Sequence, residues 1–406
     1  MTGHGLSKYL SKNIPDCKVS AFIDSDPSLH GSAINGIEVK APQTLPSIKE
    51  KLSNILIIVA VSLKEEEIST QLIDLGFDAT DFIMYSDYVT EFYTIDVVGT
   101  CNLRCSSCAW GDVEIKSNVP RGTMDFDSFT SVLDKAEKES GILSHVSLYS
   151  WGEPLLHPRI SDMIDEIHER GAAVAISSNL SIRSDEAIKR IAKSAPEYIK
   201  ISLSGFFQDV YEKTHNGGDI KLVKSNMYRL RYYLSRYKSK SHVDVNYHMY
   251  KDNSGTNLSK MEDLCDELGF GLSKTYALIM PLERVMDHLD GKPSQETKNL
   301  YPNLLVNIEE GIEASKTVKL DECPFLSNQV NINWDLSVPL CCTVFNRNEK
   351  TVITKDYIST SLSEINRLKS CSSLCGKCMS QHLPQYNMGY NRPSWDRVAS
   401  SKVISD

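Results

Sequence analysis

The segment "FYTIDVVGTCNLRCSSC", Phe92–Cys108, is the most informative part of the sequence, because it joins an apolar run to a loop that carries three cysteines. The run "FYTIDVVGT" is rich in aromatic and β-branched residues and predicts a β-strand. Cys101, Cys105 and Cys108 follow with the spacing C-x3-C-x2-C. The sequence therefore predicts a strand that ends in a tight loop presenting three thiols.

Strand and helix patterns alternate after this loop as far as Met280. Because a closed β/α barrel needs eight units and about six are present, we expect a partial barrel with its site at the C-terminal ends of the strands. The fold class is α/β, with a partial parallel (β/α)6 barrel over residues 91–283. The further strands are expected at 145–150, 172–178, 198–204, 243–250 and 272–280, and the helices between them at 126–140, 159–171, 184–194, 222–237 and 257–269.

Residues 1–90 have the pattern of a small α/β unit. Strands are expected at Lys18–Pro27 and Asn54–Ser62, followed by an amphipathic helix that ends near Gly76. The opening "TGHGLSKYL" has the pattern of a glycine turn that enters a helix, as in nucleotide-binding folds, but no strand precedes it. We therefore expect a truncated Rossmann-like α/β domain, which either binds a nucleotide or serves for docking.

Residues 284–406 form a third region. The polar stretch 281–299 carries Pro and Gly and predicts a boundary or linker. Beyond it, the chain has little regular pattern but contains six cysteines: Cys323, Cys341, Cys342, Cys371, Cys375 and Cys378.

The composition argues against several classes of partner. The net charge of −9 over 406 residues makes a broad nucleic-acid-binding face unexpected, and we interpret the basic segment Arg229–His242 as a solvated helix face. No apolar run is long enough to cross a membrane. The N-terminus lacks the apolar core of a secretory signal, so we expect a cytoplasmic protein whose 11 cysteines are reduced.

Three closely spaced thiols suit an iron–sulfur cluster better than zinc. A structural zinc site takes four ligands, usually in Cys-x2-Cys pairs, and a catalytic zinc site normally includes His or a carboxylate. A four-iron cluster held by three cysteines keeps one iron without a protein ligand. Such an iron is a binding site.

The cysteine loop and the strand ends that follow it resemble those of the radical S-adenosylmethionine (radical SAM) family. "SWGEP", Ser150–Pro154, is similar to the family's GGEP motif, although Trp151 replaces the first glycine. Ser107 stands before the third cysteine, where an aromatic residue is common, and Trp110 could replace that adenine contact. "ISSNLS" and "ISLSGFFQDVYEKTHNGG" lie where the family contacts the cofactor's carboxylate and ribose.

The resemblance implies a cofactor, a reaction and a set of site residues. Cys101, Cys105 and Cys108 would hold a [4Fe–4S] cluster, and S-adenosylmethionine would be cleaved to a 5′-deoxyadenosyl radical that abstracts a substrate hydrogen. An electron donor such as flavodoxin or ferredoxin is implied as a partner. The cofactor-binding residues implied are Gly152, Glu153, Ser178, Asn179, Ser202 and Ser204.

The C-terminal cysteines resemble the family's SPASM/twitch auxiliary-cluster region. In that region's usual pattern, a first Cys is followed, about a strand's length later, by a Gly that stands shortly before a second Cys, and a Cys-x2-Cys pair comes later. Leu336 occupies the position of this glycine. We expect one auxiliary [4Fe–4S] cluster, and a zinc ribbon on the same thiols is the alternative. Cys342 and Cys371 are reserves or core thiols, and Cys17 and Cys265 are ordinary buried thiols. The expected ligands are Cys323, Cys341, Cys375 and Cys378.

The leading functional prediction is a radical SAM enzyme acting on a small polar substrate, such as a sugar or a nucleotide-linked metabolite, with net oxidation or epimerisation. One alternative is a peptide maturase of the SPASM class, although we recognise no helix-turn-helix peptide-binding module ahead of the barrel. The other is a non-catalytic iron–sulfur or zinc scaffold that carries electrons or docks a partner. Candidate general bases are His215, His248 and Tyr276, although such residues are more often structural than catalytic.

Overall fold

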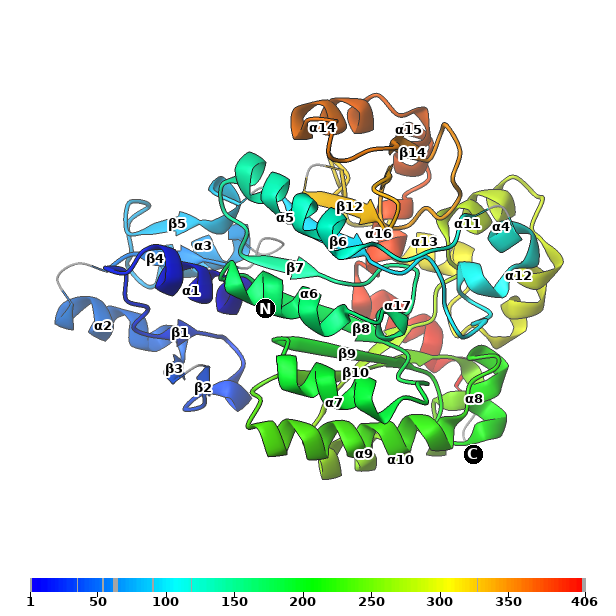
Figure 1. Ribbon diagram of the computed structural model, residues 1–406, viewed down its shortest axis with the longest axis horizontal. Coiled ribbons are helices and arrows are strands. Elements are labelled where there is room, and N and C mark those ends of the chain that lie inside the picture. Colours follow the sequence, from blue (N-terminus) through cyan, green and yellow to red (C-terminus); the bar gives the residue numbers. More distant parts are fainter. Residues whose placement is uncertain are drawn as a thin grey trace.

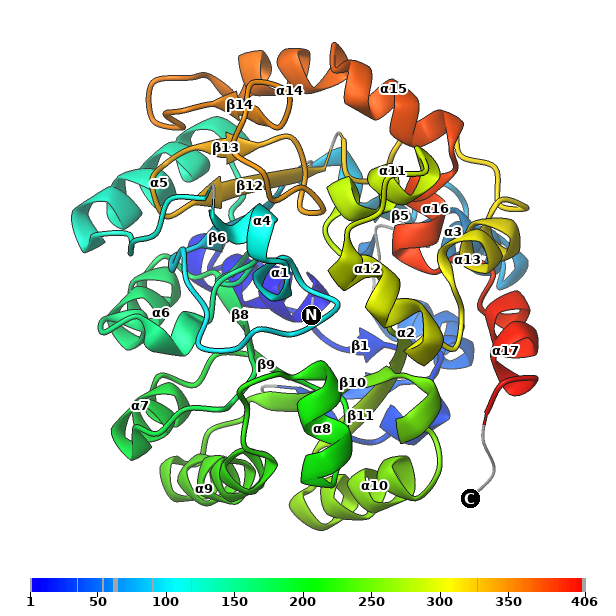
Figure 2. The ribbon, with the colours of Figure 1, turned by 90° about the vertical axis from the view of Figure 1, so that its right-hand side faces the viewer.

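The computed structural model describes residues 2–34, 36–52, 55–60, 65–89, 91–117, 119–326 and 328–403. Its main element is a seven-stranded, fully parallel sheet in the order β11-β10-β9-β8-β7-β6-β12. The two edge strands are β11 and β12, so the sheet forms an open partial barrel (Figure 2). The strands are β6 (Phe92–Asp96), β7 (His145–Ser147), β8 (Ala173–Ser178), β9 (Tyr198–Leu203), β10 (His242–Met249), β11 (Gly271–Tyr276) and β12 (Gln329–Asn333).

Helices cover the outer face of this sheet, and the largest hydrophobic core of the molecule lies between the two layers (Figures 1 and 2). The short helix α4 (Val113–Ser117) follows the cysteine loop, and α8 (Gln208–Thr214) follows β9. The covering helices are α5 (Phe126–Ser140), α6 (Ile160–Glu169), α7 (Asp185–Ser194), α9 (Ile220–Tyr237) and α10 (Thr256–Leu268).

The six predicted strands and the helices between them are confirmed, because each has a strong local signal. Helix α5 begins and ends where the sequence predicts. Its N-cap residue Asp125 accepts a hydrogen bond from the Ser128 amide at 2.8 Å, and Gly141 follows the last turn with φ of 73°. An acidic cap and a terminal glycine can be recognised from a few residues, so such boundaries are predictable.

The seventh strand was not predicted. β12 comes from the cysteine-rich region and pairs with β6, with Gln329 opposite Phe92 and Asn333 opposite Asp96. The C-terminal region therefore extends the barrel sheet next to the strand that leads into the cysteine loop. The domain boundaries at 90/91 and 283/284 stay a prediction.

The sequence predicted a boundary or linker at 281–299, but this polar stretch is largely helical. It contains α11 (Leu282–Leu289) and α12 (Gln295–Leu300). The rest of the C-terminal region is also more regular than expected, because its short helices give weak periodic patterns. It contains α13 (Ile308–Ser315), β13 (Val338–Pro339), β14 (Val352–Thr354), α14 (Leu362–Ser370), α15 (Ser373–Ser380), α16 (Leu383–Met388) and α17 (Arg392–Ser400).

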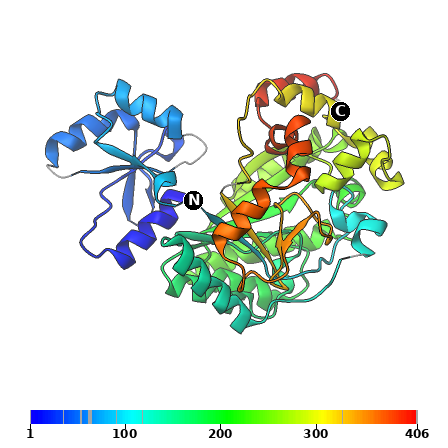
Figure 3. The same cartoon turned by 90° about the horizontal axis from the view of Figure 1, so that it is seen from above.

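The N-terminal residues form a lobe beside the barrel, clearly visible in Figure 3. The lobe has a three-stranded sheet in the order β1-β3-β2 and a separate parallel pair, β4 and β5. β1 and β3 are parallel, whereas β2 and β3 are antiparallel, so a single parallel sheet is not formed by the described residues. Its elements are α1 (Thr2–Asn13), β1 (Phe22–Ile23), β2 (Ala33–Ile34), β3 (Ile37–Lys40), α2 (Leu45–Lys51), β4 (Ile57–Val59), α3 (Glu65–Asp74) and β5 (Phe82–Met84).

Two expectations about this lobe reach residues that the structure does not describe. The strand predicted at 54–62 is described only at 55–60, and the helix predicted from residue 64 is described from Glu65. Helix α3 ends before Gly76, whose φ is 86°, as expected. No helix among the described residues is long and apolar enough to cross a membrane.

The opening glycines do not form the predicted turn, because they lie inside helix α1. A Cβ at Gly5 would lie 2.6 Å from the Ser144 carbonyl oxygen, next to the start of β7. Glycine at this position lets the helix approach the N-terminal ends of the strands. In the structure, glycine is needed at this position for close packing and not for phosphate binding.

Glu197 connects α1 to the same end of the barrel. Its buried carboxylate forms an ion pair with Lys8, lies 3.1 Å from His168 Nε2 and accepts the Val174 amide at 2.7 Å. Burial acts to raise the pKa of Glu197, but His168 and Lys8 outweigh this effect and lower the pKa from 4.5 to about 2.

Acidification should weaken this end of the barrel. Because the folded pKa lies below the unfolded one, the stabilisation is complete above about pH 4.5 and is lost as the pH falls toward about 2, amounting to about 3 kcal/mol. Thermal unfolding of the wild type and of Glu197→Gln between pH 6 and pH 3 should show a weaker pH dependence in the variant. Glu364→Gln, an exposed control on α14, should behave like the wild type. Equal pH dependence in Glu197→Gln would contradict this role.

Candidate functional site

The cysteine loop follows β6 and is held by backbone hydrogen bonds. Within it, the Cys108 amide donates to the Cys105 carbonyl at 3.0 Å. The Ser106 amide donates to the Thr214 carbonyl, also at 3.0 Å, which anchors the loop on the end of α8. A Cβ at Gly111 would lie 2.3 Å from the Cys105 carbonyl oxygen, so glycine there lets the chain close tightly behind the loop.

The three thiols of this loop lie close enough to influence one another. Burial raises the pKa of Cys101 to about 12, with further upward effects from Glu153 and Cys108. Burial also raises the pKa of Cys105, to which Cys108, Cys101 and Glu153 add. Two of the acidic groups that influence Cys105 are the neighbouring thiols, and thiolates are the donors that hold an iron–sulfur cluster.

Glu153 joins the ends of β7 and β8 to the cysteine loop. The Ser178 hydroxyl donates to its Oε1 at 2.7 Å, and the Asn179 amide donates to its Oε2 at 2.8 Å. The Asn179 side chain donates to Asn102 at 2.9 Å, and its Nδ2 lies 3.6 Å from Cys101 Sγ. Three predicted cofactor-binding residues are therefore connected to one predicted cluster ligand.

Asp96, at the end of β6, holds the segment before Glu153. Its buried carboxylate accepts the Trp151 amide at 3.1 Å and the Gly152 amide at 3.2 Å. A Cβ at Gly152 would lie 1.6 Å from the Val98 carbonyl oxygen, so no larger residue fits without a backbone shift. Burial raises the pKa of Asp96 to about 6, against the effect of these two amides.

The remaining predicted cofactor contacts are serines of β9 and the turn after it. The Ser202 hydroxyl lies 3.3 Å from the Ser177 hydroxyl. The Ser204 hydroxyl is fully buried, contacts the Thr214 hydroxyl and lies 2.7 Å from His215 Nδ1. Ser204 therefore supports the segment on which the cysteine loop rests, and direct contact of either serine with the cofactor stays a prediction.

The candidate bases are occupied by internal contacts. Burial lowers the pKa of His215 to about 3 and that of His248 to about 4, so both imidazoles are neutral near pH 7. The Tyr276 hydroxyl donates to Asp396 at 2.6 Å. These contacts suit the structural reading of the three residues.

Arg284 and Tyr211 also face the cysteine loop, although sequence analysis did not identify them. Arg284 on α11 is 1% exposed, and its Nη1 donates to the Ser106 carbonyl at 2.9 Å. Its Nη2 and the Tyr211 hydroxyl are buried without a hydrogen-bond partner among the described residues. Charge on Arg284 lowers the pKa of Cys108, against the burial that raises it. Three thiols and two unpaired donors around one loop fit an anionic cluster with its bound cofactor.

No local signal could have revealed Arg284, because its carbonyl partner lies 178 positions earlier in the chain. Asp96 could have been recognised from the sequence, since it is an acidic residue at the end of an otherwise apolar strand pattern.

The second cysteine set collects thiols from three places in the C-terminal region. Burial raises the pKa of Cys378, and charges on Cys341, Cys323 and Cys375 add to the shift, so these four thiols interact electrostatically. Cys342 is also influenced by Cys341 and Cys323, whereas Cys371 is exposed. The four predicted ligands therefore lie in one region with Cys342 as a fifth thiol, and their role as a ligand set stays a prediction.

Leu336 lies in the turn between β12 and β13 and has a left-handed backbone, with φ of 66°. Its amide donates to the Asn333 carbonyl at 2.9 Å. Glycine adopts this conformation without strain, whereas leucine rarely adopts it. The backbone is therefore of the kind expected at the glycine position to which Leu336 was aligned.

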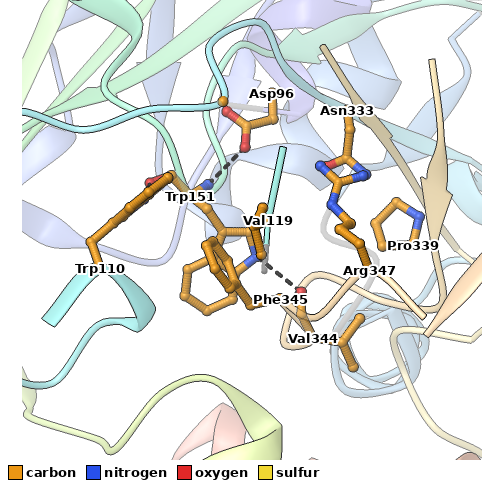
Figure 4. A pocket seen from close by; sticks show the side chains of 10 residues that line it. Asp96, Trp110, Val119, Trp151, Asn333, Pro339, Val344, Phe345 and Arg347 are labelled. Atoms are coloured by element: carbon orange, nitrogen blue, oxygen red, sulfur yellow. Dashed lines mark hydrogen bonds between the residues drawn. The ribbon is translucent and has the colours of Figure 1, made fainter. Parts of the chain in front are cut away.

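A pocket lies between the barrel and the C-terminal region, close to the cysteine loop (Figure 4). Its wall combines aromatic rings with a polar end, and Arg347 there is attracted to both Asp335 and Asp96. Its lining includes Asp96, Trp110, Trp151, Asn333, Phe345 and Arg347.

Within the described part of the chain, no three His, Cys, Asp or Glu side chains are grouped so that they could hold a single metal ion. A four-iron cluster differs from such a site, because each thiolate binds a different iron.

Comparison with known proteins identifies the barrel region. Residues 95–243 match the family model of the Radical SAM superfamily. Over 116 residues, the chain is 34% identical to the tungsten-containing aldehyde ferredoxin oxidoreductase cofactor-modifying protein of Pyrococcus furiosus. That match covers 28% of this chain and 30% of the relative, so it spans less than a third of the relative's length.

Similar solved structures cover more of the chain at lower identity. Native anSMEcpe with bound AdoMet is 14% identical with a TM-score of 0.48, covering 76% of this chain and 96% of that one. Streptococcus suis SuiB bound to precursor peptide SuiA is 14% identical with a TM-score of 0.48, covering 72% and 67%. BtrN in complex with AdoMet and 2-DOIA is 14% identical with a TM-score of 0.43, covering 75% and 91%.

Proposed function

We propose that this chain, which belongs to the Radical SAM superfamily through residues 95–243, abstracts a hydrogen atom from a small polar substrate. Cys101, Cys105 and Cys108 would hold a [4Fe–4S] cluster. When bound, the cluster and S-adenosylmethionine supply a 5′-deoxyadenosyl radical for that abstraction.

The protein's own residues hold this site in place. Asp96 fixes the Trp151 and Gly152 amides, and Glu153 ties the β8 end to the loop. Arg284 holds the loop carbonyl of Ser106 and places a positive charge beside Cys108. These contacts would orient the cofactor in a largely buried site, where water is kept away from reactive species.

One observation carries the proposal. Glu153, Ser178 and Asn179 come from the ends of two strands, yet hydrogen bonds join them to one another and to the neighbourhood of Cys101. A purely structural thiol site would not need a buried carboxylate beside its ligands. The arrangement therefore favours a cofactor site over a scaffold.

The substrate is proposed from the pocket in Figure 4. Aromatic rings of Trp110 and Trp151 form one side, and Asp96 and Arg347 offer charged groups at the other. The chemistry of this lining suits a small molecule with several polar groups. The enclosed space is only about that of one water molecule, so the lining side chains would have to move apart to admit such a substrate. The pocket also lies beside the cysteine loop, since Trp110 packs in one cluster with Cys101 and Cys108.

We further propose that Cys323, Cys341, Cys375 and Cys378 hold one auxiliary [4Fe–4S] cluster. Their mutual influence on pKa values supports a common site. A cluster ligated by four cysteines has no open iron, so it would serve electron transfer rather than substrate binding.

Anaerobic reconstitution with iron and sulfide tests the proposed function. The wild-type chain should bind about eight irons, corresponding to two four-iron clusters. When reduced with dithionite and supplied with S-adenosylmethionine, it should release 5′-deoxyadenosine, measured by chromatography. Absence of this product from a chain with both clusters would contradict the enzyme assignment. Zinc in the C-terminal site would contradict the auxiliary cluster alone.

A further inference from the structure

Lys369 is a fully buried lysine beside the second cysteine set. Its side chain, on α14, is 0% exposed. Its Nζ donates to the carbonyl oxygen of Gln329, the first residue of β12. Figure 2 shows α14 and α15 running over the β12–β14 region. In the sequence, Lys369 looks like an ordinary solvent-exposed helix residue, so its neighbours along the chain do not predict that it is buried.

The ammonium of Lys369 has no carboxylate partner in the part of the chain that the structure describes. Among the described residues, no carboxylate oxygen lies within the 4.0 Å of an ion pair with its Nζ. The acidic groups that influence its pKa are the thiols of Cys341, Cys342 and Cys375 and, more weakly, the Glu91 carboxylate. Arg284 is the other buried lysine or arginine among the described residues, and its Nε lies 3.9 Å from Asp112 Oδ2.

A buried ammonium without a counter-charge is costly, because several kcal/mol of hydration are lost. Burial lowers the pKa of Lys369, and Cys341, Cys342 and Cys375 counteract that shift. Four thiolates around a metal centre would supply the missing negative charge. The position of Lys369 is therefore explained if the second cysteine set is anionic.

We propose that Lys369 is the counter-cation of the second cysteine set and raises the reduction potential of the centre bound there. This inference rests on the proposed auxiliary cluster. Reduction adds a negative charge to the centre, and a buried positive charge nearby favours the reduced form. Lys369 would not bind the centre itself; its charge would act on the centre from beside the thiolates.

Substitutions separate this charge from the hydrogen bond that joins α14 to β12. Lys369→Gln keeps an N–H donor for the Gln329 carbonyl but removes the charge, whereas Lys369→Arg keeps both. Lys377→Gln is the matched control. Lys377 lies between Cys375 and Cys378 in sequence, but its side chain is 42% exposed and pairs with Asp290. Solvent should screen its charge.

The test is a redox titration of the reconstituted holoprotein, in which electron paramagnetic resonance monitors the reduced fraction of the second cluster. In Lys369→Gln, the ratio of reduced to oxidised cluster at a fixed potential should fall about tenfold, which is a shift of about 59 mV to more negative values for one electron. Lys369→Arg and Lys377→Gln should titrate close to the wild type. The first cluster should be unchanged in all three variants.

Each outcome is informative. A second cluster whose potential is unchanged in Lys369→Gln would overturn the inference while the auxiliary cluster stands. A wild-type chain without a second cluster would overturn the auxiliary cluster itself. If Lys369→Gln loses the cluster and Lys369→Arg keeps it, the charge is required, as proposed. Loss in both variants, with an intact first cluster, would show a packing role and overturn the inference.

Discussion

Replacing Cys105 by alanine is expected to abolish the cleavage of S-adenosylmethionine. Cys105 is the middle thiol of the loop, and both Cys101 and Cys108 influence its pKa. A four-iron cluster held by three protein thiolates loses a corner ligand when one thiol is removed, and two thiolates do not retain it. Iron should fall from about eight to about four per chain, and 5′-deoxyadenosine should no longer form under reducing conditions.

The control for this experiment is Cys17→Ala. Cys17 lies in the loop after α1, outside both cysteine sets, and is only partly buried. This variant should keep the full iron content and the full rate of cofactor cleavage. Persistent 5′-deoxyadenosine formation by Cys105→Ala would remove the basis for the radical SAM assignment of this loop.

Gly152→Ala should damage both the fold and the cofactor site. The added Cβ would lie 1.6 Å from the Val98 carbonyl oxygen and 3.0 Å from Asp96 Oδ1. The backbone must then move, which breaks the hydrogen bonds from Trp151 and Gly152 to Asp96. We expect a loss of about 3 kcal/mol of stability, visible as a lower thermal midpoint. Release of 5′-deoxyadenosine should fall in parallel, since the displaced segment leads directly into Glu153.

Gly3→Ala provides a matched control. A Cβ at Gly3 would make an ordinary contact of 3.6 Å with Ala60, and alanine is favoured over glycine within a helix. Its thermal midpoint should equal or slightly exceed that of the wild type. If Gly152→Ala retains the wild-type midpoint and rate, the close approach to Val98 is not a constraint on this site.

The barrel was predictable because its signals are local. Caps, terminal glycines and apolar periodicity within about 15 residues define helices such as α5 and strands such as β8. The role of the N-terminal glycines, by contrast, is not set by their local sequence. Gly3 and Gly5 looked like a phosphate-binding turn, yet Gly5 lies in a helix packed against Ser144. The reason for a glycine depends on which group packs against it, and for Gly5 that group is Ser144, far away in the sequence.

The cysteine spacing indicated an iron–sulfur loop, and its resemblance to the radical SAM family, together with the "SWGEP" segment, indicated the class of chemistry. The alternation of strand and helix patterns was sufficient to determine the six-strand core of this protein. Only the tertiary structure placed β12 beside β6, brought Arg284 to Ser106 and buried Lys369 among the C-terminal thiols. Sequence patterns report on residues a few positions apart. The choice of a distant partner depends on packing and charge compensation across the whole fold, so it becomes visible only there.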